Sequence, residues 1–223
     1  MKRLFIILLL VTMLPACGRL PQIRETDPAT AQRTAADCAT LFPKGAWQFV
    51  HAIQFFPPDG SNQTLMGVVR LNSETGQLQI AMMTIEGLVL FMAEHDGVTT
   101  TIQRAVAPLD RPGMAQGMVD DIRLIFFAPD PSGAEIGHTP EQERVCRYPL
   151  PDGGLEEIRP GAHGAWEIRR YNPFHRLRRS VTPLAGENAL TAGIPARVEL
   201  IAPGLAGYRL VMNLVEATPI EHY

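Results

Sequence analysis

The stretch TLMGVVRLNSETGQLQIAMMTIEGLVLFMAEHDGVTTTIQR, residues 64–104, decides the fold of this chain. It predicts four strands in succession, at 64–71, 77–85, 88–94 and 98–104, separated by short polar or glycine-containing breaks. Strands joined by such short connections pair with their sequence neighbours in antiparallel fashion. The stretch is therefore predicted to form an antiparallel meander.

Three of these strands contain stretches that are apolar on both faces instead of alternating between apolar and polar residues. Residues 66–69, 80–83 and 88–92 are nearly continuous apolar segments, so other parts of the protein must cover both faces of the sheet. A curved antiparallel sheet wrapped around a helix meets this need. The inside of such a sheet either packs solid or leaves an apolar cavity.

The flanking sequence supplies the helix and more strands. Met114, Met118, Ile122 and Phe126 recur every four residues, the spacing of one face of an amphipathic helix. The other predicted elements are a helix at 28–41 and strands at 47–55, 143–148, 155–159, 163–171, 196–202 and 208–216. The predicted class is mainly β with some helix (α+β).

The N-terminus predicts a lipoprotein signal peptide. Lys2 and Arg3 precede an apolar run at 4–14 that is short for a membrane-spanning helix. The run ends in Leu-Pro-Ala-Cys-Gly, which resembles the lipobox of bacterial lipoproteins, so Cys17 is the predicted lipid-attachment residue. The alternative is an ordinary secretory signal followed by an incidental cysteine.

The rest of the chain is predicted to be one domain behind a tether. Residues 1–16 form the predicted signal peptide, and 17–30 a lipidated tether of polar, proline-containing composition. Residues 31–223 are enough to bury a single core. Acyl chains on the first residue of the tether would hold the domain at a membrane.

Charge and cysteine content limit the partners. The chain has 20 Lys and Arg against 23 Asp and Glu, a net charge of -3, so no nucleic-acid partner is predicted.

With Cys17 assigned to lipid, Cys38 and Cys146 remain, and an even remainder in an oxidising compartment favours a disulfide. The alternative is two buried reduced thiols. Neither cysteine has a second Cys or a His at ligand spacing, so no metal site is predicted.

Motifs for catalysis are absent from the sequence. It contains no nucleophile elbow, no histidine pair at helical spacing and no glycine loop for phosphate. The sequence therefore predicts a protein that is not an enzyme and has no cofactor. An enzyme whose site is assembled from distant polar residues remains an alternative.

Methionines are frequent on the predicted core elements. Flexible thioethers suit a pocket for acyl or polyene chains of variable length, and ordinary filling of gaps in a core explains them equally well. These methionines are Met66, Met82, Met83, Met92, Met114, Met118 and Met212.

Five arginines concentrate around one predicted turn. Arg169, Arg170, Arg176, Arg178 and Arg179 could contact lipid head groups, because guanidinium groups match phosphate geometry. The alternative is a solvated hairpin whose arginines pair with neighbouring acidic residues.

Several local strings resemble the outer-membrane lipoprotein receptor LolB and its half-barrel relatives of the LolA/LolB type. Residues 78–88 look like the strand, exposed turn and strand of that family, 117–129 like its internal helix, and 194–200 like its late strand entry. The resemblance implies a strongly curved antiparallel sheet that forms an unclosed half-barrel with helices covering its mouth. It also implies lipid anchoring at the periplasmic face of the outer membrane and an apolar interior that receives acyl chains.

Three further strings are similar to an uncharacterised lipoprotein family, domain of unknown function 3261. They are residues 87–91, the helix end at 126–129, and 166–168. Members of this family are often encoded with aryl-polyene lipid biosynthesis genes. The resemblance therefore implies an envelope lipid as cargo.

The turn at Ile85, Glu86 and Leu88 is the membrane-facing turn that the resemblance implies. The LolB receptor projects a leucine before the matching glycine, whereas this chain has Glu86 there. A glutamate is costly to insert into lipid, which argues against lipoprotein transfer in the strict sense.

Large apolar residues that are in phase within their strands are the predicted cavity lining. The leading hypothesis is a carrier or acceptor for a lipid-like cargo (acyl, aryl-polyene lipid or lipoprotein acyl chains), with periplasmic carriers or envelope biosynthesis proteins as partners. The alternative is a structural or assembly lipoprotein that tethers an envelope or biosynthetic complex and has a solid core. The predicted lining residues are Trp47, Phe49, Leu90, Met92, Trp166, Ile168, Leu210 and Met212.

Overall fold

The computed structural model describes residues 20–107, 109–111, 113–162, 164–184, 194–205 and 207–221. The predicted signal peptide and Cys17 lie outside these residues. The helices are α2 (Pro28–Ala39) and α3 (Met114–Phe126). The strands are β1 (Ala46–Phe56), β2 (Gln63–Asn72), β3 (Gln77–Thr84), β4 (Val89–Asp96), β5 (Thr100–Ala105), β6 (Glu135–His138), β7 (Arg144–Pro149), β8 (Leu155–Pro160), β9 (Trp166–Tyr171), β10 (Leu177–Pro183), β11 (Arg197–Ala202) and β12 (Tyr208–Pro219).

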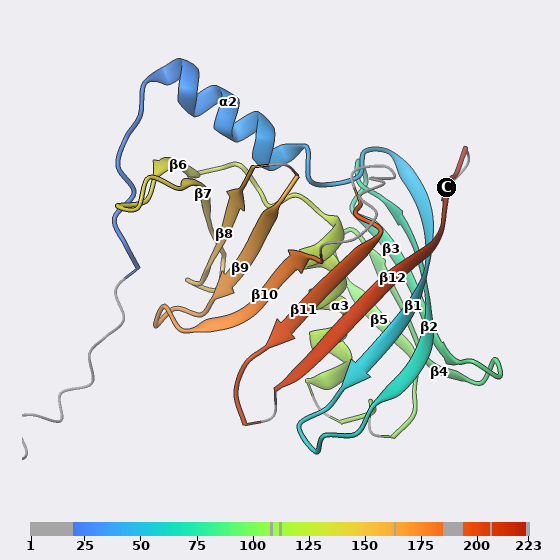
Figure 1. Ribbon diagram of the computed structural model, residues 1–223. Coiled ribbons are helices and arrows are strands. Elements are labelled where there is room, and N and C mark those ends of the chain that lie inside the picture. Colours follow the sequence, from blue (N-terminus) through green and yellow to red (C-terminus); the bar gives the residue numbers. More distant parts are fainter. Residues whose placement is uncertain are drawn as a thin grey trace, which may run out of the picture.

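Twelve strands of the described chain form one sheet in the order β5-β4-β3-β2-β1-β12-β11-β10-β9-β8-β7-β6. The predicted meander continues from β1 to β5, and a second run of antiparallel neighbours leads from β6 to β12. Pairing of β1 with β12 joins the two halves. The sheet curves strongly, and β5 and β6 remain as its two edges (Figure 1). The prediction of a mainly β, unclosed antiparallel half-barrel is confirmed.

Helix α3 lies inside the curve of the sheet (Figure 1). Leu124 and Phe126 at its C-terminal end are almost fully buried. The Phe126 ring stacks on that of Phe49 in β1, with 5.3 Å between centroids and 11° between planes, and such pairs add about 0.5–1.5 kcal/mol beyond area burial. The helix predicted from the four-residue period is therefore present and packs against the concave face.

A β-bulge in β4 changes which residues face inward. In the pairing of β3 with β4, Met82 opposes Phe91 and Met83 opposes Val89, so Leu90 is the extra residue. An extra residue interrupts the strict alternation of a strand. Phe91 is consequently buried at 0 % exposure, whereas Met92 is 36 % exposed on the other face. The prediction that Leu90 and Met92 share a face is wrong because of this bulge.

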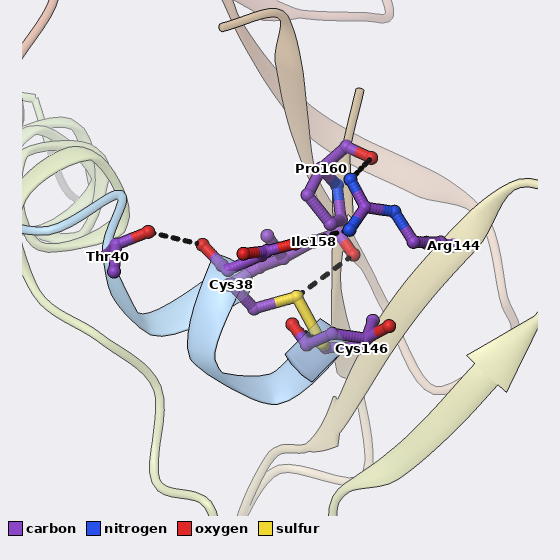
Figure 2. The surroundings of a disulfide bond; sticks show 8 residues. Cys38, Thr40, Arg144, Cys146, Ile158 and Pro160 are labelled. Atoms are coloured by element: carbon purple, nitrogen blue, oxygen red, sulfur yellow. Dashed lines mark hydrogen bonds and ion pairs between the residues drawn. A yellow bond between two sulfur atoms is a disulfide. The ribbon is translucent and has the colours of Figure 1, made fainter. Parts of the chain in front are cut away.

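Helix α2 is fixed to the second half of the sheet by a disulfide. Cys38 near its C-terminal end is bonded to Cys146 of β7, and both residues are fully buried. Figure 2 shows the bond beside β8, where the Ile158 carbonyl approaches the Cys38 sulfur at 3.9 Å. An ion pair between Asp37 and Arg144 links the same two elements. The disulfide predicted from the cysteine count is confirmed.

Part of the segment predicted as a tether lies against the sheet. The backbone N–H of Arg24 donates to the His138 carbonyl at 2.8 Å, and the His138 N–H donates back at 3.1 Å. This short pairing covers the edge of β6, which limits unwanted pairing of an edge strand. The predicted helix follows, with Asp27 as its N-cap accepting the Thr30 N–H.

Candidate ligand-binding cavity

A cavity of about 320 Å³ lies between the concave face of the sheet and α3. Met114, Met118 and Ile122 of α3 line one side, and apolar side chains of β1 to β4 and β12 line the other. Small-molecule sites have volumes of about 300–1,000 Å³ and mostly apolar walls. The cavity therefore has the size and chemistry of a site for an apolar ligand or part of one.

The cavity runs along β1 from an exposed end into the core. Phe55, Ile53 and His51 occupy alternate positions of this strand and all line the cavity. Gln63, which pairs with Phe55, also lines it and is exposed to solvent. Phe49, next in the row, is fully buried against Phe126 and belongs to the core outside the cavity wall. The strand rise places His51 about 13 Å from Phe55.

Two glycines lie in the wall, and one of them occupies a crowded position. A Cβ on Gly67 of β2 would come within 2.6 Å of the Ile53 Cδ1 atom, so only glycine leaves that side chain its place. Gly117 of α3 lies opposite the Arg179 guanidinium, at 3.8 Å from the position of a Cβ. A glycine within a helix costs about 1 kcal/mol relative to alanine. An alanine at position 117 would make only an ordinary contact with Arg179, so crowding does not explain this glycine.

Four of the methionines on the predicted core elements line the cavity. They are Met82, Met114, Met118 and Met212. Met66, Met83 and Met92 are not among the residues that line it. Both interpretations of the methionine content thus have support, because Met212 also packs in the core cluster. The methionines of α3 give one wall a shape that can adapt to a ligand.

A buried polar cluster crosses the cavity wall and connects three elements. Asp121 of α3 accepts hydrogen bonds from the Arg179 guanidinium of β10 and from the Tyr208 hydroxyl of β12. The Arg179 guanidinium also lies 5.3 Å from the centre of the Tyr208 ring. Burial raises the pKa of Asp121, while Arg179 and Tyr208 act in the opposite direction. The cluster fastens α3 to the sheet from inside the cavity.

His51 is the polar residue at the inner end of the cavity. It is 2 % exposed, and its Nδ1 atom is enclosed without a hydrogen-bond partner. The centres of the Phe49 and Phe126 rings lie 6.3 and 5.8 Å from the centre of the His51 ring. Removal from water lowers the pKa of His51 to about 4. The imidazole is therefore neutral at neutral pH.

The protein is expected to lose stability through His51 as the pH falls from 6.5 to about 4. The imidazole pKa is 6.5 in the unfolded chain and about 4 in the folded one, so the unfolded state takes up the proton first. Stability is fully present above pH 6.5 and declines by about 3 kcal/mol across this window. Urea denaturation at a series of pH values measures it. The His51→Phe variant should show a pH dependence smaller by that amount, and identical curves would contradict the assignment.

The residues predicted to line the cavity divide into three groups. Leu90, Leu210 and Met212 line it. Met92 lies on the exposed face of β4, as described above. The remaining four pack in or against the hydrophobic core, outside the cavity wall, and are therefore corrected to core residues. They are Trp47, Phe49, Trp166 and Ile168.

Sequence reasoning did not assign the polar residues of the cavity. His51 and Tyr208 alternate in phase with the apolar lining of their strands, at two residues from Ile53 and from Leu210. Asp121 lies three residues after Met118 on the same face of α3. The available signal was a polar residue within an otherwise apolar face, which often marks a functional position.

The turn between β3 and β4 is exposed, as the membrane-facing prediction requires. Ile85 and Leu88 are 68 % and 57 % exposed, and Glu86 between them is exposed as well. Gly87 has a φ of 88°, which glycine adopts without strain. Whether this turn contacts a membrane stays a prediction.

Most of the clustered arginines are engaged in ion pairs. Arg169 pairs with Glu167, Arg170 with Glu156, and Arg179 with Asp121. This pairing agrees with the alternative interpretation of a hairpin whose arginines bind neighbouring acids. The prediction that these three contact head groups is therefore replaced by a structural role.

Two arginines of the cluster remain at the tip of the β9–β10 hairpin. Arg176 and Arg178 are exposed, and no salt bridge involves them within the described chain. Phe174 beside them is 80 % exposed. Head-group contact by Arg176 and Arg178 stays a prediction.

No group of three or more potential metal-ligating side chains occurs among the described residues. Within the same residues, no helix is both long enough and apolar enough to cross a membrane.

Comparisons with known proteins support the fold. No protein-family model and no curated protein matches this sequence. The crystal structure of a LolA superfamily protein from Nitrosomonas europaea aligns with 86 % of this chain and 94 % of its own, with a TM-score of 0.57 and 12 % identity. At this identity the likeness shows the fold alone, and it confirms the predicted LolA-like half-barrel.

Two other solved structures align less closely. A putative outer membrane lipoprotein-sorting protein domain from Vibrio parahaemolyticus covers 86 % of this chain and 93 % of its own, at a TM-score of 0.47 and 9 % identity. MucB covers 86 % of this chain and 61 % of its own, at a TM-score of 0.35 and 12 % identity.

Proposed function

We propose that this protein is a carrier or acceptor that binds the apolar chain of a lipid-like molecule. The observation that carries the proposal is the cavity between α3 and the sheet. Aliphatic and methionine side chains form most of its wall, and it extends from the exposed Gln63 to the buried His51. An alkyl or polyene chain is apolar enough to match these walls.

Burial of such a chain is favourable on two grounds. Apolar surface removed from water gains about 25 cal/mol per Å². An empty space inside a protein core also leaves the surrounding atoms without packing partners. A ligand that fills the cavity between Met118 and Leu210 would supply those contacts. Lipid binding would therefore stabilise the folded protein.

We place this activity at the periplasmic face of the outer membrane, on evidence from the sequence. Residues 1–16 would be removed as a signal peptide, Cys17 would carry the acyl chains, and 17–30 would connect the anchor to the domain at 31–223. The resemblance to domain of unknown function 3261 makes an aryl-polyene lipid one candidate cargo. Periplasmic carriers or envelope biosynthesis proteins would deliver or receive it.

The exposed turn between β3 and β4 bears on the class of cargo. Ile85 and Leu88 offer apolar side chains to a membrane surface, but Glu86 between them is costly to insert below the head groups. The turn therefore suits shallow contact with a membrane. This favours a free lipid chain over the acyl chains of a lipoprotein as cargo.

Native mass spectrometry of protein purified from the periplasm tests the proposal directly. For this test the chain from Arg19 onward is secreted to the periplasm behind an ordinary cleavable signal, so that it carries no lipid anchor. We expect a co-purifying mass in the lipid range that organic extraction removes. A protein that carries no such mass and gains none from envelope lipids would support the structural tether instead.

A Leu90→Trp variant is expected to weaken lipid binding at least tenfold, because the larger ring fills the cavity. Met92→Trp is the matched control, since Met92 lies two residues away on the exposed face of the same strand. Displacement of a fluorescent fatty acid measures both affinities, and tenfold corresponds to about 1.4 kcal/mol. Equal affinities of the two variants would refute the assignment of the cavity as the binding site.

A further inference from the structure

His51 differs from the other polar groups of the cavity because its imidazole ring has no hydrogen-bond partner within the described part of the protein. Asp121, Arg179 and Tyr208 also line the cavity, but they bind one another. The Nδ1 atom of His51 is enclosed by protein atoms without a partner, and the Nε2 atom, which is not enclosed in this way, has no hydrogen-bond partner among the described residues either. Nε2 is therefore the ring nitrogen left for a ligand. Buried polar side-chain atoms are normally hydrogen-bonded, and an exception calls for a physical explanation.

His51 lies where a bound chain could supply the missing hydrogen bond. The residue lies on the cavity wall four residues along β1 from Phe55 at the exposed end, and the fully buried Phe49, stacked on Phe126, follows it on the same face of the strand. A chain that enters beside Gln63 and follows β1 would reach the imidazole with its buried end. Its terminal atoms would therefore meet the one ring in this row that can form a hydrogen bond.

We propose that the cavity selects apolar chains that carry a hydroxyl group at the buried end, and that this hydroxyl forms a hydrogen bond with His51. This inference rests on the proposed function, because it specifies the class of molecule that the lipid-binding cavity accepts. The hydroxyl would lie about 13 Å along the chain from the Phe55 end of the cavity.

The chemistry of the site favours a hydroxyl over other polar groups. A neutral imidazole has one donor and one acceptor nitrogen, and a hydroxyl can both donate and accept. Burial keeps the His51 pKa near 4, so the ring offers no positive charge to a carboxylate or phosphate. An anion beside the buried His51 would also lose its hydration without compensation. A small neutral group that can either donate to Nε2 or accept from it, according to the tautomer, is the best match.

Matched probes test the proposal with the intact periplasmic protein. We would measure by calorimetry the affinity of saturated fatty acids and of their ω-hydroxy counterparts with the same number of carbons, over a series of chain lengths. The hydroxylated probe should bind about threefold to tenfold more tightly at the lengths that reach His51, which is the range of one net hydrogen bond. Isomers with the hydroxyl near the carboxylate should gain nothing.

Variants of His51 provide the second arm. In His51→Phe the ring remains but the hydrogen bond is lost, so the ω-hydroxy probe should bind no better than its unsubstituted counterpart, or less well. His51→Gln retains a donor and an acceptor and should keep part of the preference. Because the comparison of probes on the unaltered protein is already decisive, a variant that fails to fold does not remove the test.

The outcomes separate this inference from the proposed function. Equal affinities of the two probes for the unaltered protein would overturn the inference while the lipid-binding function stands. A preference for the hydroxylated probe that persists in His51→Phe would also overturn it. If the unaltered protein bound neither probe at any length, both the inference and the proposed function would fail.

Discussion

Replacement of Asp121 by alanine is expected to lower the free energy of unfolding by about 3–5 kcal/mol. The side chain of Asp121 is 5 % exposed and that of Arg179 is 19 % exposed. Removal of the carboxylate leaves the Arg179 charge buried without its partner, and the Tyr208 hydroxyl also loses its acceptor. The cost is large because an unpaired charge is unfavourable in a medium of low polarity. Urea denaturation followed by circular dichroism measures the loss.

Two further variants separate the charge effect from a general effect on α3. Asp120→Ala changes the neighbouring residue, whose carboxylate accepts an exposed hydrogen bond from Gln116, and should cost at most about 0.5 kcal/mol. Asp121→Leu combined with Arg179→Met removes both charges and should recover most of the stability, as seen when buried ion pairs are replaced by apolar residues. A loss below about 1 kcal/mol in Asp121→Ala would show that the cluster does not hold the helix.

The local elements of the fold could be predicted from the sequence because their signals are local. The short breaks between the strands at 64–104 establish antiparallel neighbours, and the four-residue period of α3 is independent of the rest of the chain. Pairing of β1 with β12 is different, since it joins segments that are far apart in the sequence. The expectation of a half-barrel therefore came from resemblance to a family, and the structure provides the pairing that joins its two halves.

The cavity could be predicted only in part, for a physical reason at each failed position. Alternation predicts that Leu90 and Met92 lie on one face of β4. The bulge at Leu90 shifts the alternation by one residue, so that Phe91 faces inward and Met92 faces outward. Trp166 and Ile168 do face inward, yet they belong to the core instead of the cavity wall. A periodic pattern reports which face of a strand is buried. It does not report whether that face meets a helix, another side chain or an empty space.

The partners of the clustered arginines could not be predicted from the local sequence either. A run of arginines suggests a free basic surface, but the acids that neutralise Arg170 and Arg179 come from β8 and α3. Those partners are 14 and 58 residues away, so no local window contains both members of a pair. The roles of Arg170 and Arg179 are therefore decided by which distant strand or helix lies against them.

Removal of the disulfide is expected to cost about 4–5 kcal/mol. The bond closes a loop of 108 residues between Cys38 and Cys146, and loops of about 100 residues give about 4.7 kcal/mol in the chain-entropy treatment. The bond lowers the conformational entropy of the unfolded chain, because α2 and β7 stay joined after the protein unfolds. Denaturation of the Cys38→Ala, Cys146→Ala double variant against the oxidised protein measures the difference. Reduction of the unaltered protein should give a loss of similar size.

The ion pair beside the disulfide provides the matched control for this prediction. Asp37→Ala breaks the contact with Arg144, which joins the same helix to the same strand, but both side chains are more than a third exposed. Water already screens that pair, so its loss should cost less than about 1 kcal/mol. If Asp37→Ala were as damaging as the double cysteine variant, contacts between α2 and the sheet would explain the stability and the covalent bond would not. A large loss confined to the cysteine variant would instead assign the attachment of α2 to the disulfide.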